Sequence, residues 1–301
     1  MDIAINTDFL TSTRSPEPWL KAIAEAGFTH LHWCHQWNTD FLYSADEIKQ
    51  IALWLKTYGL KLLDIHGSTG VEKMWHSPVE YQRRAGVELV KNRAIMLREL
   101  GGTGSLMMHA PILSVRQTEE QKDQALLRYE AYRRSLDELM PCLEKYGALI
   151  AIENMAHENF ELLGRVLADY PEDRIGITYD SGHGNIGAAQ GLDLLTPLRS
   201  RLQALHLNDN DTTGDLHQPP FYGTVDWNRM TDILADSGYR NRPLSFELSI
   251  RNTPFFDKTK EPPVNQDPEK IHAFLADAYE RCAKVVSLYE SKCGASPEEL
   301  I

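Results

Sequence analysis

The 301-residue chain has few cysteines and no long hydrophobic run, and both features limit the class of protein it can be. Its four cysteines, Cys34, Cys142, Cys282 and Cys293, have neither metal-type nor disulfide-type spacing, so we expect reduced thiols in a cytoplasmic protein. The N-terminus lacks a basic region followed by an apolar stretch, which argues against a signal peptide. No apolar run approaches the ~18 residues that cross a bilayer, so we expect no membrane association.

Positive charge is also scarce. Lys and Arg number 31 against 43 Asp and Glu, and the formal net charge is -12. This balance argues against a surface built for nucleic acid or an anionic membrane. Segments 34–44, 181–190 and 208–227 contain neither Lys nor Arg. The hydrophobic fraction of 42% and the charged fraction of 25% are ordinary for a soluble globular protein.

Strand-like and helix-like segments alternate along the whole chain. The predicted strands are 3–6, 29–33, 61–66, 105–109, 148–154, 175–180, 203–208 and 243–248. The predicted helices are 18–26, 45–58, 78–100, 118–146, 160–169, 192–201, 227–237 and 268–292.

Eight βα units in about 300 residues favour an α/β fold of the (β/α)8 TIM-barrel type, as one domain over residues 1–294 with a loose tail at 295–301. The rival is a doubly wound open sheet, which usually has a glycine-rich first turn. Segment 6–9 has no glycine, and polar strand ends recur from the third strand to the eighth. Both observations favour the closed barrel.

Six of the predicted strands carry a potential metal ligand at or near the carboxyl end. In chain order these residues are His66, His109, Glu153, Asp180, His206 and Glu247. An unpaired polar group at the end of a buried strand costs free energy, so we expect these side chains to converge on one polar centre. The carboxyl ends of barrel strands form the face where such enzymes place their chemistry. The sequence therefore predicts a metal site there.

Three further candidates lie in the loops after the sixth and seventh strands: His183, Asp215 and His217. Histidine and carboxylate ligands without cysteine suit Mn²⁺, Zn²⁺, Co²⁺ or Fe²⁺. Each residue also has a structural interpretation, because a lone histidine can be hydrogen-bonded in the core and Asp180 can cap a turn. If all nine residues had only structural roles, their position at one end of the barrel would require nine separate coincidences. We therefore predict a bound divalent metal. For His66 and His109, ligation and substrate contact remain alternatives.

Several motifs carry a resemblance to a known family. They are Ile152-Glu153-Asn154, Asp180-Ser181-Gly182-His183, His206-Leu207-Asn208-Asp209, Asp215-Leu216-His217, Tyr222-Gly223-Thr224-Val225-Asp226-Trp227 and Phe246-Glu247. Together they resemble the sugar phosphate isomerase/epimerase superfamily. This is the xylose isomerase-like TIM-barrel group, which also contains AP endonuclease family 2, the endonuclease IV type. The resemblance extends from the first strand to the eighth.

The two branches imply different metal sites. Resemblance to the ketose epimerases implies one Mn²⁺ or Co²⁺ held by Glu153, Asp180, His206 and Glu247, with both glutamates moving the proton and His183 contacting a substrate oxygen. Resemblance to endonuclease IV implies three Zn²⁺ ions and phosphodiester hydrolysis. All nine ligand types of that branch have counterparts here: His66, His109, Glu153, Asp180, His183, His206, Asp215, His217 and Glu247.

We expect a divalent-metal-dependent isomerase or epimerase acting on a sugar, polyol or keto-sugar. Glu153 and Glu247 lie three strands apart and would face each other across the mouth, so a proton could leave to one glutamate and return from the other through a metal-bound enediolate. The zinc endonuclease and a sugar dehydratase or lyase remain alternatives. The loops without Lys or Arg favour a small sugar over DNA, which needs cationic surface.

The remaining expectations concern ligands and partners. Mn²⁺ is the expected metal, with Co²⁺, Zn²⁺, Fe²⁺ or Mg²⁺ as alternatives. Aromatic faces stack on sugar rings, so Trp33 and Trp75, together with Asn6, are predicted substrate contacts. A phosphosugar would need an anchoring cation, for which the loops offer Arg14, Lys73, Arg116 and Arg251. We also expect a homo-oligomer, either a dimer or a tetramer.

Overall fold

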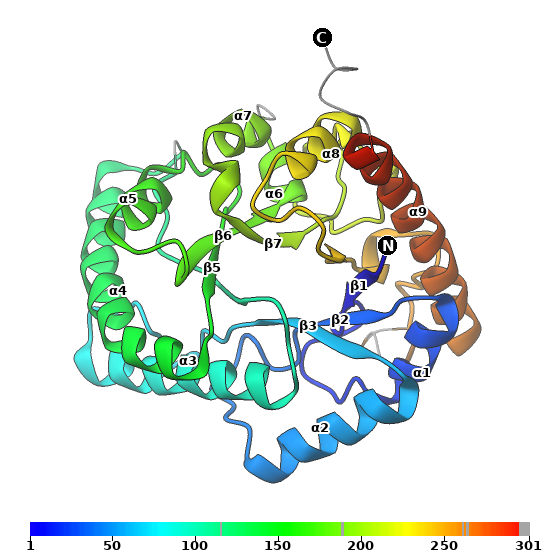
Figure 1. The fold of residues 1–301 in the computed structure, drawn as a ribbon, viewed down its shortest axis with the longest axis horizontal. Helices are drawn as coiled ribbons and strands as arrows, with labels where there is room; N and C mark the ends of the chain where they lie inside the picture. The colour runs from blue at the N-terminus through cyan, green and yellow to red at the C-terminus, as the bar shows by residue number, and fades with distance from the viewer. Residues whose placement is uncertain (115, 188–189, 261, 263–264, 295–301) are drawn as a thin grey trace.

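The computed structural model describes residues 1–114, 116–187, 190–260, 262 and 265–294, and it shows a ring of strands enclosed by helices (Figure 1). The strands are β1 (Ile3–Asn6), β2 (His30–Trp33), β3 (Lys61–His66), β4 (Leu106–Met108), β5 (Ile150–Glu153), β6 (Ile175–Asp180), β7 (Leu202–His206) and β8 (Leu244–Phe246). The α-helices are α1 (Glu17–Ala26), α2 (Ala45–Tyr58), α3 (Glu80–Glu99), α4 (Glu119–Tyr146), α5 (Glu161–Asp169), α6 (Ser181–Asn185), α7 (Gly191–Leu195), α8 (Trp227–Ala235) and α9 (Pro268–Gly294). Two 3₁₀ helices, η1 (Thr196–Arg201) and η2 (Ile250–Asn252), complete the fold.

The eight strands form one parallel sheet in the order β7-β6-β5-β4-β3-β2-β1-β8. The two ends of this sheet meet at a parallel bridge between Leu207 and Phe246. There the amide of Leu207 donates to the carbonyl of Ser245 at 3.0 Å, and the amide of Glu247 donates to the carbonyl of Leu207 at 3.1 Å. The chain is therefore a single-domain TIM barrel, as predicted, and the open-sheet alternative is wrong.

Local sequence signals account for several helix ends. Ser44 begins α2 with a capping box, in which its hydroxyl accepts from the amide of Glu47 and the Glu47 carboxylate accepts from the amide of Ser44. Gly59 ends the same helix with φ of 68°, a left-handed conformation that glycine adopts at low cost. Pro141 lies inside α4 without ending it.

The structure differs from the sequence prediction mainly between β6 and β7. The expected helix over 192–201 is a short α7 followed by the 3₁₀ helix η1, which has a proline in its first turn. The segment directly after β6, expected to be a turn or loop, forms α6, because the carboxylate of Asp180 accepts from the amide of His183 and caps it. The predicted tail at 295–301 lies outside the described residues.

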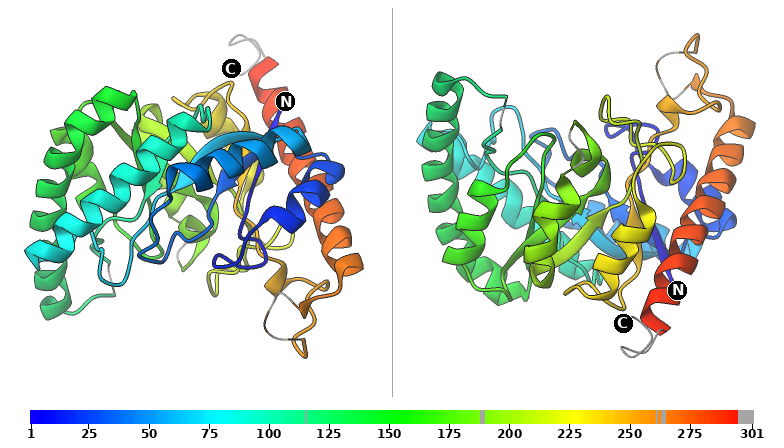
Figure 2. Two further views of the ribbon diagram at one scale, coloured as in Figure 1. Left: turned by 90° about the horizontal axis from the view of Figure 1, so that it is seen from below. Right: turned by 90° about the horizontal axis from the view of Figure 1, so that it is seen from above.

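The first strand and the last helix meet at the amino-terminal side of the barrel, as the side views show (Figure 2). The amino group of Met1 lies 2.9 Å from Oε1 of Glu290 on α9. Among the residues described, no helix is both long and apolar enough to cross a membrane.

Candidate metal centre

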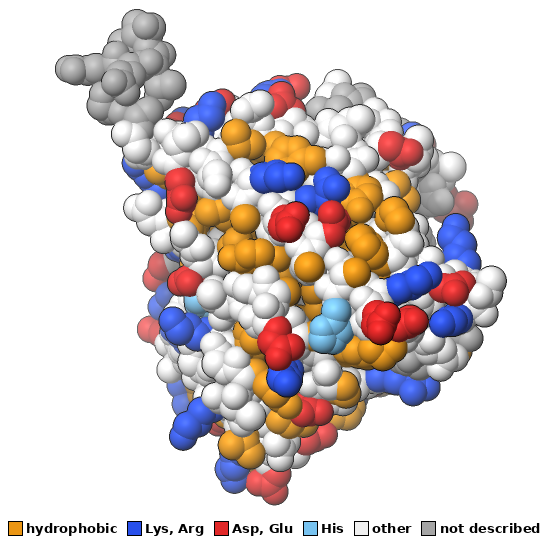
Figure 3. All heavy atoms as spheres, turned by 90° about the vertical axis from the view of Figure 1, so that its right-hand side faces the viewer, with side chains coloured by type: hydrophobic (Ala, Val, Ile, Leu, Met, Phe, Trp, Pro, Cys, Tyr) orange, Lys and Arg blue, Asp and Glu red, His pale blue; other side chains and the backbone are white. Residues whose placement is uncertain are grey.

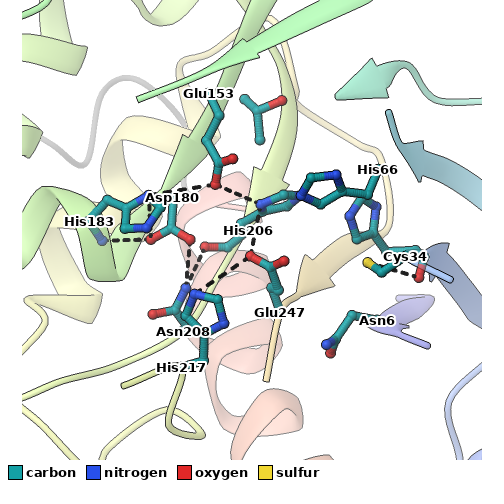
Figure 4. A network of polar contacts seen from close by, with 12 residues as sticks. Asn6, Cys34, His66, Glu153, Asp180, His183, His206, Asn208, His217 and Glu247 are labelled. Carbon is teal, nitrogen blue, oxygen red and sulfur yellow. Dashed lines mark hydrogen bonds and ion pairs between the residues drawn. The ribbon is translucent and has the colours of Figure 1, made fainter. Parts of the chain in front are cut away.

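Four of the predicted ligands meet at the carboxyl ends of the strands (Figure 4). Glu153, Asp180 and His206 are the last residues of β5, β6 and β7, and Glu247 follows β8 directly. One ligand atom from each lies within 4.8 Å of the others. All four side chains are buried, with Glu247 the most exposed at 6%.

The centre is built around His206. Its Nδ1 lies 2.8 Å from Oε1 of Glu153 and 2.9 Å from Oε2 of Glu247. Asp180 is fixed at one side, because its carboxylate accepts from the side-chain amide of Asn208 at 2.8 Å and from the backbone amide of His183 at 2.6 Å. The three carboxylates are thus held in place before any ligand arrives.

The protein environment changes the acidity of these groups. Burial opposes ionisation of Glu153 and Glu247, but the adjacent His206 outweighs it and holds the pKa of both carboxyls below the usual range. Burial raises the pKa of Asp180 to about 6, and Glu153 adds to this rise. Burial also opposes protonation of His206, yet its carboxylate neighbours raise its pKa well above the usual value. Glu153 and Glu247 thus both interact with the positive charge of the same imidazole.

This residue set fits a divalent metal ion. Nε2 of His206 is buried and has no hydrogen-bond partner among the described residues, and Oε2 of Glu153 is buried with only the imidazole of His109 beside it, at 2.8 Å. A buried polar atom without a partner is costly, and a cation that accepts lone pairs would remove that cost. The carboxylate oxygens and imidazole nitrogen are donors of the kind that Mn²⁺, Fe²⁺, Co²⁺ and Zn²⁺ accept.

The other five predicted ligands surround this centre. His66 and His109 form a second group with Glu153, and Nε2 of His109 lies 2.8 Å from Oε2 of Glu153 without hydrogen-bond alignment. His183 and His217 form a third group with Asp180. Asp215 joins these two histidines, because its carboxylate oxygens lie 3.3 Å from Nε2 of His183 and 2.9 Å from Nε2 of His217. The structure therefore brings all nine predicted residues together.

Of the three predicted substrate contacts, Asn6 lies beside the centre (Figure 4), whereas the two tryptophans lie in the core. Trp33 and Trp75 are buried in the core, where Nε1 of Trp33 donates to the hydroxyl of Tyr43 and Nε1 of Trp75 donates to the carbonyl of His109. Asn6 joins β1 to the segment after β8 through two hydrogen bonds with the backbone of Leu248. Neither tryptophan presents a face to the metal centre.

Sequence reasoning missed a buried polar pair beside the centre. Nδ1 of His32 lies 2.7 Å from Oδ1 of Asp64, and both side chains are almost fully buried. The ring of His32 contacts that of His206 edge to face, with centroids 4.5 Å apart. Both residues lie inside predicted strands, and a charged or imidazole side chain within an apolar strand is the signal that could have found them.

Trp37 was not among the predicted site residues. Its ring lies over His66, with centroids 4.4 Å apart, and edge-on to His109 at 5.4 Å. Its Nε1 donates to Asp8 at 3.2 Å. Trp37 therefore supplies the aromatic surface that the sequence analysis had assigned to Trp33 and Trp75.

The acidic loop after β7 has mainly a structural role. Asp209 is fully buried and accepts from the backbone amides of Phe221 and Val225 and from Nε1 of Trp227. Asp226 caps α8 by accepting from the amide of Arg229. These two carboxylates are therefore engaged in shaping the loop and capping the helix that follows it.

Fold and motifs together define the class of protein. Residues 20–277 match the family described as the xylose isomerase-like TIM barrel, and the chain belongs to that family. An uncharacterized protein of Sinorhizobium fredii is 29% identical over 287 residues, which cover 88% of this chain and 91% of that protein.

Solved structures with the same fold include sugar epimerases. A D-tagatose 3-epimerase-like protein superposes with a TM-score of 0.72 at 18% identity, over 97% of this chain and 99% of that one. An L-ribulose 3-epimerase gives 0.69 at 18% identity, over 97% and 96%. The IolI protein, solved with a zinc atom, gives 0.65 at 13% identity, over 98% and 100%. At these identities the likeness establishes the fold.

Proposed function

We propose that this protein is a divalent-metal-dependent sugar isomerase or epimerase that moves a proton between Glu153 and Glu247. The observation that carries the proposal is the buried group in which Glu153, Asp180, His206 and Glu247 bring ligand atoms within 4.8 Å of one another. The epimerases among the structural neighbours support sugar as the substrate class.

The two glutamates have the arrangement that proton transfer requires. They belong to strands on different sides of the barrel, and each has an oxygen within 3 Å of the same nitrogen of His206. Both are ionised, because their pKa values are held below the usual range, so either can accept a proton from a carbon next to a carbonyl. The bound cation supplies Lewis acidity that stabilises negative charge on substrate oxygens.

Several other residues around the centre have proposed roles in this scheme. Asp180 and His206 complete the ligand set, with Mn²⁺ as the proposed metal. Both ring nitrogens of His183 have partners, the carbonyl of Asn154 at 2.9 Å and Asp215 at 3.3 Å, so His183 would orient a substrate oxygen through Nε2 in exchange for its contact with Asp215. Trp37 and His66 form the aromatic wall against which a sugar ring would lie.

The proposal is tested by solvent exchange. Purified protein loaded with Mn²⁺ is incubated with a panel of ketoses and aldoses in D₂O, and deuterium at carbon is measured by NMR. We expect Glu153→Gln and Glu247→Gln each to lower the exchange rate at least ~10²-fold, because general-base catalysis contributes about 10²–10⁴-fold. Asp46→Asn, an exposed carboxylate on α2, is the matched control and should exchange at the wild-type rate. Near-normal exchange in Glu247→Gln would refute the two-glutamate scheme.

A second candidate function is metal-dependent phosphodiester hydrolysis, as in the endonuclease IV branch. The observation that favours it is the presence of three overlapping ligand groups, which could hold three ions. DNA binding at this centre calls for clustered positive charge near the strand ends, yet segments 34–44, 181–190 and 208–227, which follow strands, contain neither Lys nor Arg. The side of the barrel made by α9 and α1 likewise shows Lys and Arg side chains interspersed with Asp and Glu (Figure 3). Cleavage of a duplex with an abasic site in the presence of Zn²⁺ would establish this second function.

A further inference from the structure

Two cavities adjoin the candidate metal centre, and they differ in charge. The first, of about 150 Å³, reaches His183 and is lined by Glu158 but by no Lys or Arg. The second, of about 510 Å³, reaches His109 and is lined by Arg128 on α4. Met155, two residues beyond Glu153, borders both. A substrate at the centre therefore has two directions in which a substituent could extend, and one of them leads to a guanidinium.

The larger cavity contains unsatisfied polar groups. Its wall includes His76, which is 9% exposed and whose buried Nδ1 has no hydrogen-bond partner among the described residues. The guanidinium of Arg128 has no ion-pair partner in the part of the chain that the structure describes. Arg128 lies near enough to His76 for its charge to add to burial in lowering the pKa of that imidazole to about 4. A solvent-exposed guanidinium and a buried imidazole nitrogen without a hydrogen-bond partner among the described residues thus border the same cavity.

The rest of the lining suits a polar ligand of moderate size. Gln124 is exposed on the same face of α4 and offers an amide to the cavity. Gln117 and Gln121 also line it, but their side chains already bond to the backbone at the start of α4. A volume of about 510 Å³ falls within the range of about 300–1,000 Å³ that ligand pockets occupy.

We propose that the cavity between His109 and Arg128 binds an anionic group, a phosphate or a carboxylate, carried by the sugar that reacts at the metal centre. This inference rests on the proposed function and narrows its substrate class to acidic sugars. A guanidinium matches the planar, paired oxygens of a phosphate or carboxylate, and an unpaired arginine beside a reactive centre is well suited to orient such a substrate. None of the cations that the sequence analysis singled out lines this cavity.

One acidic residue, Glu120, also lines the cavity. It lies eight positions before Arg128 on α4, which separates the two along the helix axis by about 12 Å at 1.5 Å per residue. Glu120 and Arg128 are both exposed to solvent, so at this separation their charges are largely screened from each other. The anion site is therefore placed at the Arg128 end, next to His76.

The test compares matched sugars. Each active ketose or aldose is offered to the Mn²⁺-loaded enzyme as the neutral sugar, as its terminal phosphate and as its uronate, and kcat/KM for C–H exchange in D₂O is measured. We expect an acidic member to exceed the neutral one at least tenfold. Arg128→Gln should reduce that ratio by about ten- to a hundredfold, mainly through KM, as for the loss of a charge-assisted hydrogen bond. Lys145→Gln, which removes a charge from the far end of α4, should leave the ratio unchanged.

The outcomes separate this inference from the proposed function. Equal or better turnover of neutral sugars by the wild type, or an unchanged ratio in Arg128→Gln, would overturn the anion site while leaving the isomerase intact. If no sugar exchanges, the proposed function fails, and inorganic phosphate then serves as the probe. Phosphate should raise the melting temperature of the wild type more than that of Arg128→Gln. Equal shifts in both proteins would overturn the anion site independently of turnover.

Discussion

At the residue scale, the main feature of the molecule is a group of polar side chains buried at the carboxyl ends of the barrel strands. Glu153 and Glu247 share a nitrogen of His206, and Asp180 completes the set within 4.8 Å. Such a concentration of buried carboxylates is unfavourable unless positive charge compensates it. A divalent cation would compensate the negative charge of these carboxylates, and two of them, Glu153 and Glu247, could also act as bases. We therefore propose that the same residues bind the metal and transfer the proton.

The pair of His32 and Asp64 supports this centre from beside it, and its removal should be costly. Asp64→Ala leaves the buried Nδ1 of His32 without its partner at 2.7 Å. We expect the free energy of unfolding in urea to fall by about 3 kcal/mol. Asp46→Ala, an aspartate that is 92% exposed on α2, should change it by less than about 0.5 kcal/mol. A loss at Asp64 no larger than at Asp46 would show that the pair contributes nothing.

His76 should make stability depend on pH. Burial, with Arg128 nearby, lowers its pKa from 6.5 to about 4, so the folded protein favours the neutral imidazole. The unfolded chain therefore binds more protons between these values, and stability falls as the pH drops from about 6.5 to 4. The total decrease in the free energy of unfolding from this one group amounts to about 3 kcal/mol. His76→Gln should show a smaller loss than the wild type in chemical denaturation at pH 7 and pH 4.5, and His272→Gln, an exposed histidine, should not.

At the scale of helices and strands, the sequence best predicted the features that depend on the residues of a single segment. Apolar runs located all eight strands, and the candidate ligands were identified because a histidine or carboxylate at the end of such a run has no role in packing. Glu247 was identified as a candidate although β8 spans only Leu244–Phe246. The contact of Trp37 with His66 could not be predicted, because it joins segments distant in sequence. The cap at Asp180 is local, only three residues from His183, and the sequence analysis had raised it as the cap of a turn.

The capping box of α2 gives a prediction for a single element. Ser44→Ala removes the hydroxyl that accepts from the amide of Glu47 at 3.2 Å. We expect the protein to lose about 1 kcal/mol of stability, as for other N-cap serines, measured by urea unfolding. Ser44→Asp should retain most of it, since a carboxylate can accept the same bond and favours the positive end of the helix dipole. Equal loss in both variants would contradict the capping role.

At the scale of the whole molecule, the barrel closes through β7 and β8, the strands that lead into His206 and Glu247. The same closure brings these residues to Glu153 and Asp180 from the adjoining strands. A cation shared by these four side chains would therefore tie the ends of the sheet together. Metal binding and global stability are linked for this reason.

Metal removal should accordingly lower the melting temperature. Addition of Mn²⁺ at about 100 times its dissociation constant stabilises the folded state by about 2.7 kcal/mol, a shift of several degrees relative to chelator-treated protein. Asp180→Asn should lose most of this shift, because it removes a carboxylate from the ligand set. Calorimetric scans with and without Mn²⁺ measure the shift in melting temperature of the wild type and of Asp180→Asn. A full shift in Asp180→Asn would place the metal elsewhere.

The central claim, one catalytic metal held by Glu153, Asp180, His206 and Glu247, is tested most directly by counting metal ions. Protein purified without chelator from cells grown with both Mn²⁺ and Zn²⁺ is analysed by elemental mass spectrometry. We predict one divalent ion per chain, Mn²⁺ above the others, and its loss in His206→Ala. Three Zn²⁺ ions per chain would contradict the account and favour phosphodiester hydrolysis, and a chain without metal would refute both.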